Sequence, residues 1–152
     1  MKKTFSTLAL ITIFGAGGAL AQDYGAELKA RQGQMRLLAL NLGILGGMAK
    51  GDREYDAELA QAAAENFLIV TGLNQVTQWP EGSHTQAIEG SDAKAEVWTN
   101  FADFQKKWGD LAAPAAQLQT AAGQGAAEIG AALGPVGGAC KACHDDYRVP
   151  QN

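Results

Sequence analysis

The chain has 152 residues, of which 47% are hydrophobic, and its 12 basic and 16 acidic residues leave a formal net charge of −4. This length suits a single domain. An acidic chain without a basic run gains nothing from a phosphate backbone, so nucleic acid is excluded as a natural partner.

Residues 1–21 have the three parts of a secretory signal peptide. Lys2 and Lys3 form a positive start, residues 5–20 are mainly apolar and small, and Ala19-Leu20-Ala21 is a cleavage site of the A-x-A type. The alternative is a retained membrane helix, but the apolar run is too short and too rich in glycine. We expect a mature domain of residues 22–152 with a formal charge of −6, in the periplasm of a bacterium and without membrane contact.

The first predicted helix covers about residues 24–50. Leu28, Met35, Leu38, Leu42 and Leu45 recur at heptad-like spacing, and Arg31 completes this row. A second apolar row, formed by Leu37, Ile44 and Met48, is expected on nearly the opposite side. A helix with two apolar sides has a second burial partner, and a subunit interface is the natural candidate.

The second predicted helix begins at Asp56, a suitable N-cap, and ends near Leu73. Its inward residues are Leu59, Ala63, Phe67 and Val70. Residues 74–96 are predicted to be irregular because they contain a proline, glycines and serines typical of loops. Such a long loop is unusual in a compact domain, so we expect it to wrap part of the core or cover a cofactor.

Two further helices are predicted, over about residues 100–122 and 126–148. Pro114 should bend the third helix, and Gly134-Pro135 should kink or break the fourth. The third has an inward row of Phe101, Phe104, Trp108, Leu111, Ala115 and Leu118, and the fourth has Ile129, Leu133, Val136, Cys140, Cys143 and Tyr147. Together the segments predict an all-α fold, an antiparallel four-helix bundle.

The fourth helix contains the two cysteines of the chain in the sequence Cys140-Lys141-Ala142-Cys143-His144. The C-x-x-C-H pattern predicts covalent attachment of one c-type haem per chain. Residues three apart on a helix share a face, so both thiols reach one macrocycle, and His144 follows as the proximal iron ligand. A redox dithiol is the alternative, but such sites normally accompany strands, which this sequence lacks. Both cysteines are on the inward row, so the haem should lie within the bundle.

The other candidate residues are interpreted as structural. His84, the second histidine, is expected at the surface and not as another iron ligand. The three tryptophans are expected to pack, Lys106-Lys107 to form a solvated face, and Asp145-Asp146 to point apart. A haem peroxidase or reductase would need a distal acid–base residue, so we do not expect an enzyme.

Several motifs together resemble cytochrome c′, the main class II c-type cytochrome family, over essentially the whole mature chain. They are Arg31-Gln32-x-x-Met35, Ala49-Lys50-Gly51 with Tyr55-Asp56, Val97-Trp98, and the block from Gly138 to Arg148. The resemblance implies a left-twisted bundle, often a homodimer through its first helices, with a pentacoordinate high-spin haem. It also implies binding of nitric oxide and carbon monoxide, and electron transfer with an unidentified periplasmic partner.

The resemblance also implies roles for individual residues. Cys140 and Cys143 match the thioether cysteines, His144 matches the proximal ligand, and Arg148 matches the arginine beside that ligand. Arg31 and Gln32 match a pair near a haem propionate. For both arginines the alternative is a solvated surface cation, although a guanidinium pairs well with a carboxylate.

Met35 separates two forms of the family. If its side chain only shields the iron, the open site takes a small uncharged gas and excludes larger or anionic ligands. If its sulfur is the sixth ligand, as in low-spin cytochrome c-556-like members, the protein is purely an electron carrier. The Arg31-Gln32 context favours shielding, whereas Pro135 before the haem motif favours the low-spin form.

Overall fold

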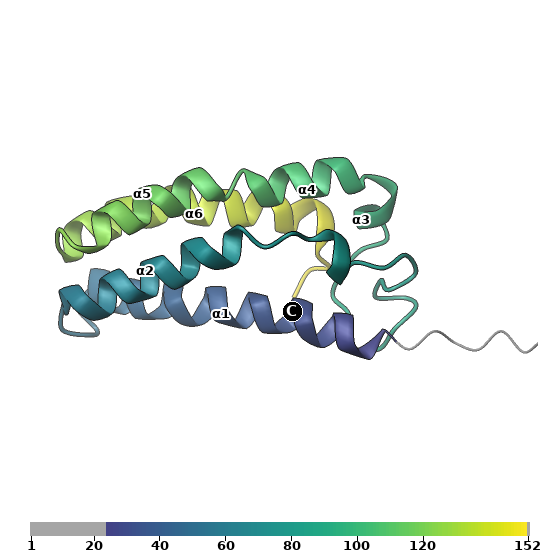
Figure 1. Ribbon diagram of the computed structural model, residues 1–152, viewed down its shortest axis with the longest axis horizontal. Helices are drawn as coiled ribbons and strands as arrows, with labels where there is room; N and C mark the ends of the chain where they lie inside the picture. Colours follow the sequence, from purple (N-terminus) through teal and green to yellow (C-terminus); the bar gives the residue numbers. More distant parts are fainter. Residues whose placement is uncertain (1–23, 152) are drawn as a thin grey trace, which may run out of the picture.

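Four helical arms lie side by side in the computed structural model, which describes residues 24–151 (Figure 1). The arms are α1 (Gly25–Lys50), α2 (Ala57–Thr71), α4 (Phe101–Gly109) continued by α5 (Ala112–Ala122), and α6 (Ala126–Tyr147). α1 packs on α2, α2 on α5, α5 on α6, and α6 again on α1. The prediction of an all-α antiparallel four-helix bundle is confirmed. Among the described helices none is long and apolar enough to cross a bilayer, and the predicted signal peptide lies outside the described residues.

The ends of α1 and α2 follow from local sequence. α1 stops at Gly51, whose positive φ of 78° suits glycine and whose N–H donates to the carbonyl of Met48. Asp56 is the N-cap of α2, and its carboxylate accepts a 3.0 Å hydrogen bond from the N–H of Leu59. Both helices begin and end within two residues of their predicted bounds.

Between α2 and α4 the chain is irregular apart from a 3₁₀ turn, η1 (Val76–Gln78), and the short helix α3 (Glu96–Thr99). The predicted long loop is therefore confirmed. Its residues 79–93 are termed the strap below.

The prediction for Pro114 is wrong, and of the two outcomes predicted at Pro135 the break is excluded. The third arm is not one bent helix, because it breaks at Asp110 and Leu111 into α4 and α5. Pro114 then lies in the first turn of α5, where a missing N–H costs little. α6 continues through Pro135 without a break. Val136 is buried directly after this proline, so tertiary packing holds the helix together there.

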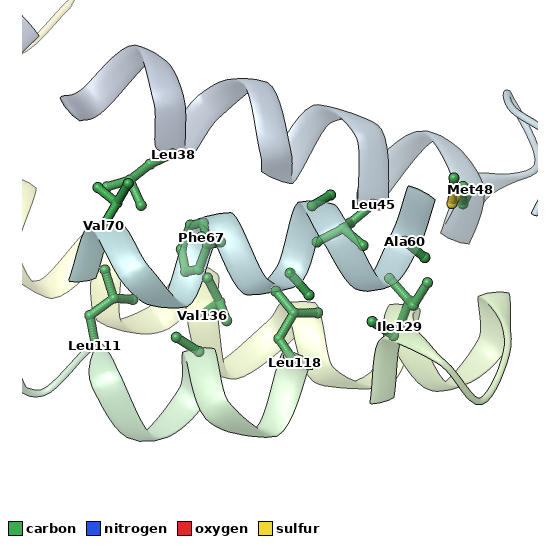
Figure 2. Packing of buried hydrophobic residues seen from close by; sticks show 14 of the residues in the cluster. Leu38, Leu45, Met48, Ala60, Phe67, Val70, Leu111, Leu118, Ile129 and Val136 are labelled. Carbon is green, nitrogen blue, oxygen red and sulfur yellow. The ribbon is translucent and has the colours of Figure 1, made fainter. Parts of the chain in front are cut away.

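The main core fills the space between the arms, and all of them contribute side chains to it (Figure 2). The predicted inward residues Phe67, Val70, Leu118, Ile129 and Val136 are all buried. Because these positions recur every three or four residues, hydrophobic periodicity located them correctly.

α1 differs from its prediction. Met48, expected on the opposite side from Leu45, is 2% exposed and packs with it in the core, and Ile44 also packs there. The buried seam of α1 consists of Arg31, Gln34, Leu38, Asn41, Leu45 and Met48. Three of these six residues are polar, so a search for apolar rows does not trace the seam. Of the expected second row, only Leu37 is exposed.

Candidate haem-attachment site

The last two turns of α6 carry Cys140, Cys143 and His144. Both cysteines are free thiols and half-buried, whereas His144 is exposed. Cys140 packs against the main core, and Cys143 packs against a second cluster. This second, aromatic cluster consists of Ala93, Val97, Phe104 and Tyr147, with Trp79, Trp98 and Phe101 packed around them. The helix thus places its two thiols where the two clusters meet.

The protonation states of the motif suit its predicted chemistry. Burial raises the pKa of the Cys140 thiol, and it raises the pKa of Cys143 to about 11. Both thiols therefore stay protonated at neutral pH. Desolvation, followed by the positive charge of Arg148, lowers the pKa of His144. Its imidazole is then mainly neutral at neutral pH, which is the form that ligates a metal.

The surroundings of the motif fit a covalently attached haem. Its two thiols are unpaired and one helical turn apart, and a neutral imidazole follows. Gly134, Gly137 and Gly138 precede the motif, and no atom lies within 4 Å of the place where a Cβ would stand at any of them. All three glycines are exposed, so this part of α6 faces open space. The fit to a haem therefore rests on the two free thiols and the imidazole that follows them.

Met35 lies in the first half of α1. α1 packs directly on α6. The Met35 side chain is partly buried and packs against the same main core as Cys140. Its thioether thus belongs to the inner side of the bundle, a placement that both the shielding role and the ligand role require.

Arg31 is buried, so the alternative of a solvated surface cation is wrong for it. The residue is 4% exposed. Its two terminal nitrogens donate to the hydroxyl and the carbonyl of Ser83, at 3.1 and 3.2 Å, and the guanidinium lies 4.6 Å from the ring centre of Trp79. Burial lowers the pKa of Arg31, and the charge of Glu27 only partly opposes this. No carboxylate among the described residues is within ion-pair distance of the guanidinium, which leaves its charge available to an anionic group.

Gln32 and Arg148 both contact the strap. The Gln32 side-chain amide donates to the carbonyl of Gly90 at 3.1 Å. Arg148 pairs with Asp92 at 3.7 Å, and its backbone forms an isolated antiparallel bridge with Ala93. The backbone N–H of Arg148 donates to the carbonyl of His144. The strap therefore ties the first half of α1 to the end of the helix that carries the motif.

The sequence analysis missed three features of the region around the strap and the end of α6. Gln34 and Gln75 form a buried amide pair at 2.9 Å, and the indole N–H of Trp79 donates to Gln75. His84 is partly buried against Trp98, and its Nδ1 has no hydrogen-bond partner among the described residues, so the surface placement is corrected. Each depends on a contact between distant segments, which local sequence does not signal.

The lysine pair of α4 was also interpreted incorrectly in part. Lys106 forms a solvated pair with Asp110, as expected. Lys107 instead pairs with Asp146 of α6 at 2.7 Å, which raises the pKa of the lysine and lowers that of the aspartate. Asp145 pairs with Lys141, so the two adjacent aspartates do point to different partners. The position of Lys107, three residues after the buried Phe104, is the signal that could have indicated this.

Comparisons with known proteins agree with this geometry. Residues 26–148 match the family described as cytochrome C′. The chain is 39% identical over 142 residues to cytochrome c′ of Cereibacter sphaeroides, covering 92% of this chain and 95% of that one. It is 38% identical over 144 residues to cytochrome c-554 of the same organism, covering 93% and 94%.

Solved structures have the same fold. A cytochrome c′ from Rhodobacter Spheriodes superposes with a TM-score of 0.80 at 38% identity, covering 86% of this chain and all of that one. Two mutants of cytochrome c prime from Alcaligenes xylosoxidans, one with nitric oxide and one with carbon monoxide bound, each have a TM-score of 0.70. Each is 32% identical and covers 84% of this chain and 98% of its own. The chain belongs to the cytochrome c′ family and, like its members, has covalently bound haem c.

Proposed function

We propose that this protein is a periplasmic haem protein that binds small uncharged gases and takes part in electron transfer. The observation that carries the proposal is the contact between α1 and α6, with Met35 and Cys140, the first cysteine of the C-x-x-C-H motif, packed against one core. Cys140 and Cys143 form the thioether bonds, and His144 is the proximal ligand of a pentacoordinate iron. Relatives solved with nitric oxide and with carbon monoxide bound support gas binding.

Met35, Arg31 and Gln32 have different roles around the haem. When bound, the haem supplies an iron that accepts one electron or one diatomic ligand. The apolar side chain of Met35 covers the distal side, where it excludes anions because they would lose their hydration without a compensating partner. The buried Arg31 guanidinium, which has no carboxylate partner among the described residues, compensates the negative charge of a propionate, with Gln32 beside it. None of these groups is a distal acid or base, so no enzymatic turnover is proposed.

A second candidate function is a low-spin electron carrier with His144 and Met35 as axial ligands. The inner placement of the Met35 thioether is compatible with it, and the similarity to a cytochrome c-556 of Agrobacterium tumefaciens (35% identical) supports it. A coordinated sulfur would occupy the gas site, raise the reduction potential and restrict the protein to electron transfer.

The absorption spectrum of the oxidised protein separates the two functions. For the gas-binding form we expect high-spin features without a methionine-to-iron charge-transfer band, and Met35→Leu should leave the spectrum unchanged. Met35→Ala should speed carbon monoxide binding, because it removes the shield. A charge-transfer band that both substitutions abolish would instead establish the electron carrier.

Two further parts of the proposal concern location and assembly. The signal peptide at residues 1–21 supports export, and the N-terminal sequence of the protein purified from periplasmic extract should begin at Gln22. Exposed apolar residues support a homodimer through α1, including Leu37 (50% exposed) and Leu40 (59%). Leu40→Glu should halve the mass in sedimentation equilibrium with an unchanged haem spectrum. Ile69→Glu, at an exposed apolar position of α2 (61% exposed), is the charge control and should keep the dimer mass.

A further inference from the structure

The backbone carbonyls at the C-terminal end of α6 accept hydrogen bonds from residues outside the helix. The last four carbonyls of a helix have no partner within it. The backbone N–H of Arg148 donates to the carbonyl of His144 at 3.0 Å. Lys94, directly after the strap, supplies two more donors, its ammonium to the carbonyl of Asp145 at 2.8 Å and its backbone N–H to that of Tyr147 at 3.0 Å. Lys94 therefore binds two carbonyls of the last helical turn, which also contains His144.

Lys107 reaches the same turn from α4. Its ammonium is 2.7 Å from a carboxylate oxygen of Asp146 and 3.4 Å from the carbonyl of Ala142. These two residues flank His144 on either side along the helix. The Lys107 side chain is 24% exposed, whereas that of Lys106 is 69% exposed and pairs within α4. Of the two adjacent lysines, only Lys107 is directed at the haem motif.

The rest of α4 holds Lys107 in place. One helical turn earlier, Asp103 accepts a 2.6 Å hydrogen bond from the Tyr147 hydroxyl, and the Phe104 ring packs edge-on against the Tyr147 ring at 5.5 Å between centres. α4 thus contacts the end of α6 at three neighbouring positions of one face. A side chain held between two packed helices keeps its orientation, unlike an exposed lysine.

We propose that Lys107, together with Lys94, is a positioning residue for the axial histidine, a role that rests on the proposed ligation of iron by His144. The thioether bonds fix where the haem lies, but the direction of the imidazole depends on the turn formed by residues 142–147. The two lysines hold that turn from outside, and contacts of this kind orient metal ligands and tune the metal. Lys107 also compensates the negative charge of Asp146, two residues after His144, so its loss would leave that charge unpaired and disfavour the reduced iron.

The test uses the haem-loaded protein and two measurements, the iron–histidine stretching band of the ferrous protein by resonance Raman spectroscopy and the reduction potential. Lys107→Met should shift the iron–histidine band and lower the reduction potential. Lys107→Arg, which keeps the positive charge, should have the wild-type band and potential. Lys106→Met, which removes the same charge one residue away, should match wild type in both. Lys94→Met should shift the band in the same direction, with the covalent haem mass unchanged.

Wild-type bands and potentials in both Lys107→Met and Lys94→Met would overturn the positioning role, even if these variants were less stable. An equal fall in potential in Lys106→Met and Lys107→Met, without a band shift, would also overturn it, because general surface charge would then suffice. If Lys107→Met does not accumulate, Asp146→Asn breaks the same contact from the other side and should shift the band. An iron–histidine band that persists in His144→Ala would instead contradict the proposed ligand.

Discussion

The two ends of the bundle are held together by different forces. At one end, where α1 turns into α2 and α5 into α6 (Figure 1), the core consists of Met48, Ala60, Ala122 and Ile129. At the other end, aromatic rings, the buried Arg31, the Gln34–Gln75 amide pair and two directed lysines surround the haem motif. The first end depends on apolar packing, and the second depends on hydrogen bonds and charges near the haem motif.

This difference predicts different responses to substitution. Loss of apolar volume costs free energy in proportion to the cavity that remains, and it leaves distant geometry intact. Loss of one partner from a buried polar network leaves the other group desolvated and unpaired, so the local arrangement fails first. We term the end with Met48 and Ile129 the far end, and the end with the haem motif the motif end. Substitutions at the far end should therefore change the free energy of unfolding, and those at the motif end should change the haem spectrum.

The largest effect should come from removing both thiols. Cys140→Ala with Cys143→Ala should abolish covalent haem, so the purified chain should have the mass of its amino acids alone. The helices of the far end should still form, because their packing does not involve the motif. Lys141→Ala, between the two cysteines, is the control and should retain haem. Covalent haem in the double variant would contradict the assignment of the attachment site.

At the far end, Ile129→Ala should lower the free energy of unfolding by about 2–5 kcal/mol, because Ile129 is fully buried. Urea denaturation measures this loss, and the haem spectrum should not change. Ile129→Val, which removes a single methylene, should lose about 0.5–1.5 kcal/mol. A changed spectrum in either variant would mean that the two ends are not independent.

At the motif end, Arg31→Met should cost about 1–3 kcal/mol, since it removes two hydrogen bonds from a charged, buried guanidinium to Ser83. The distinctive result should be faster amide hydrogen exchange within the strap, with unchanged exchange in α5. Arg36→Met is the matched control because Arg36 is exposed on the same helix. Equal protection of the strap in both variants would show that Arg31 does not anchor it.

The smallest effect should come from the N-cap of α2. Asp56→Ala removes the acceptor for the N–H of Leu59 and should cost about 1 kcal/mol. Asp56→Asn keeps an acceptor oxygen and should lose much less. Thermal unfolding measures both, and neither variant should alter the haem spectrum. A large spectral change would show that this cap affects the haem environment, which would contradict the independence of the two ends.

Much of the fold was predictable because its signals are local. Gly51, Asp56 and the spacing of Phe67, Val70, Leu118 and Ile129 each act within one or two helical turns. The C-x-x-C-H motif is also local, so the attachment site could be recognised before any contact was known. The error at Pro114 arose because neighbouring helices decide whether a proline bends, breaks or is tolerated.

The amino-acid sequence by itself determined the four-helix bundle, the haem motif and the family, since periodicity, caps and cysteine spacing are properties of adjacent residues. Only the tertiary structure decided that Arg31 is buried under the strap, that Met48 faces the core, and that Lys107 rather than Lys106 is directed at His144. Each of these depends on a partner many residues away. Whether a charged side chain is solvated or desolvated is set by the segment that packs over it, and no local pattern encodes that segment.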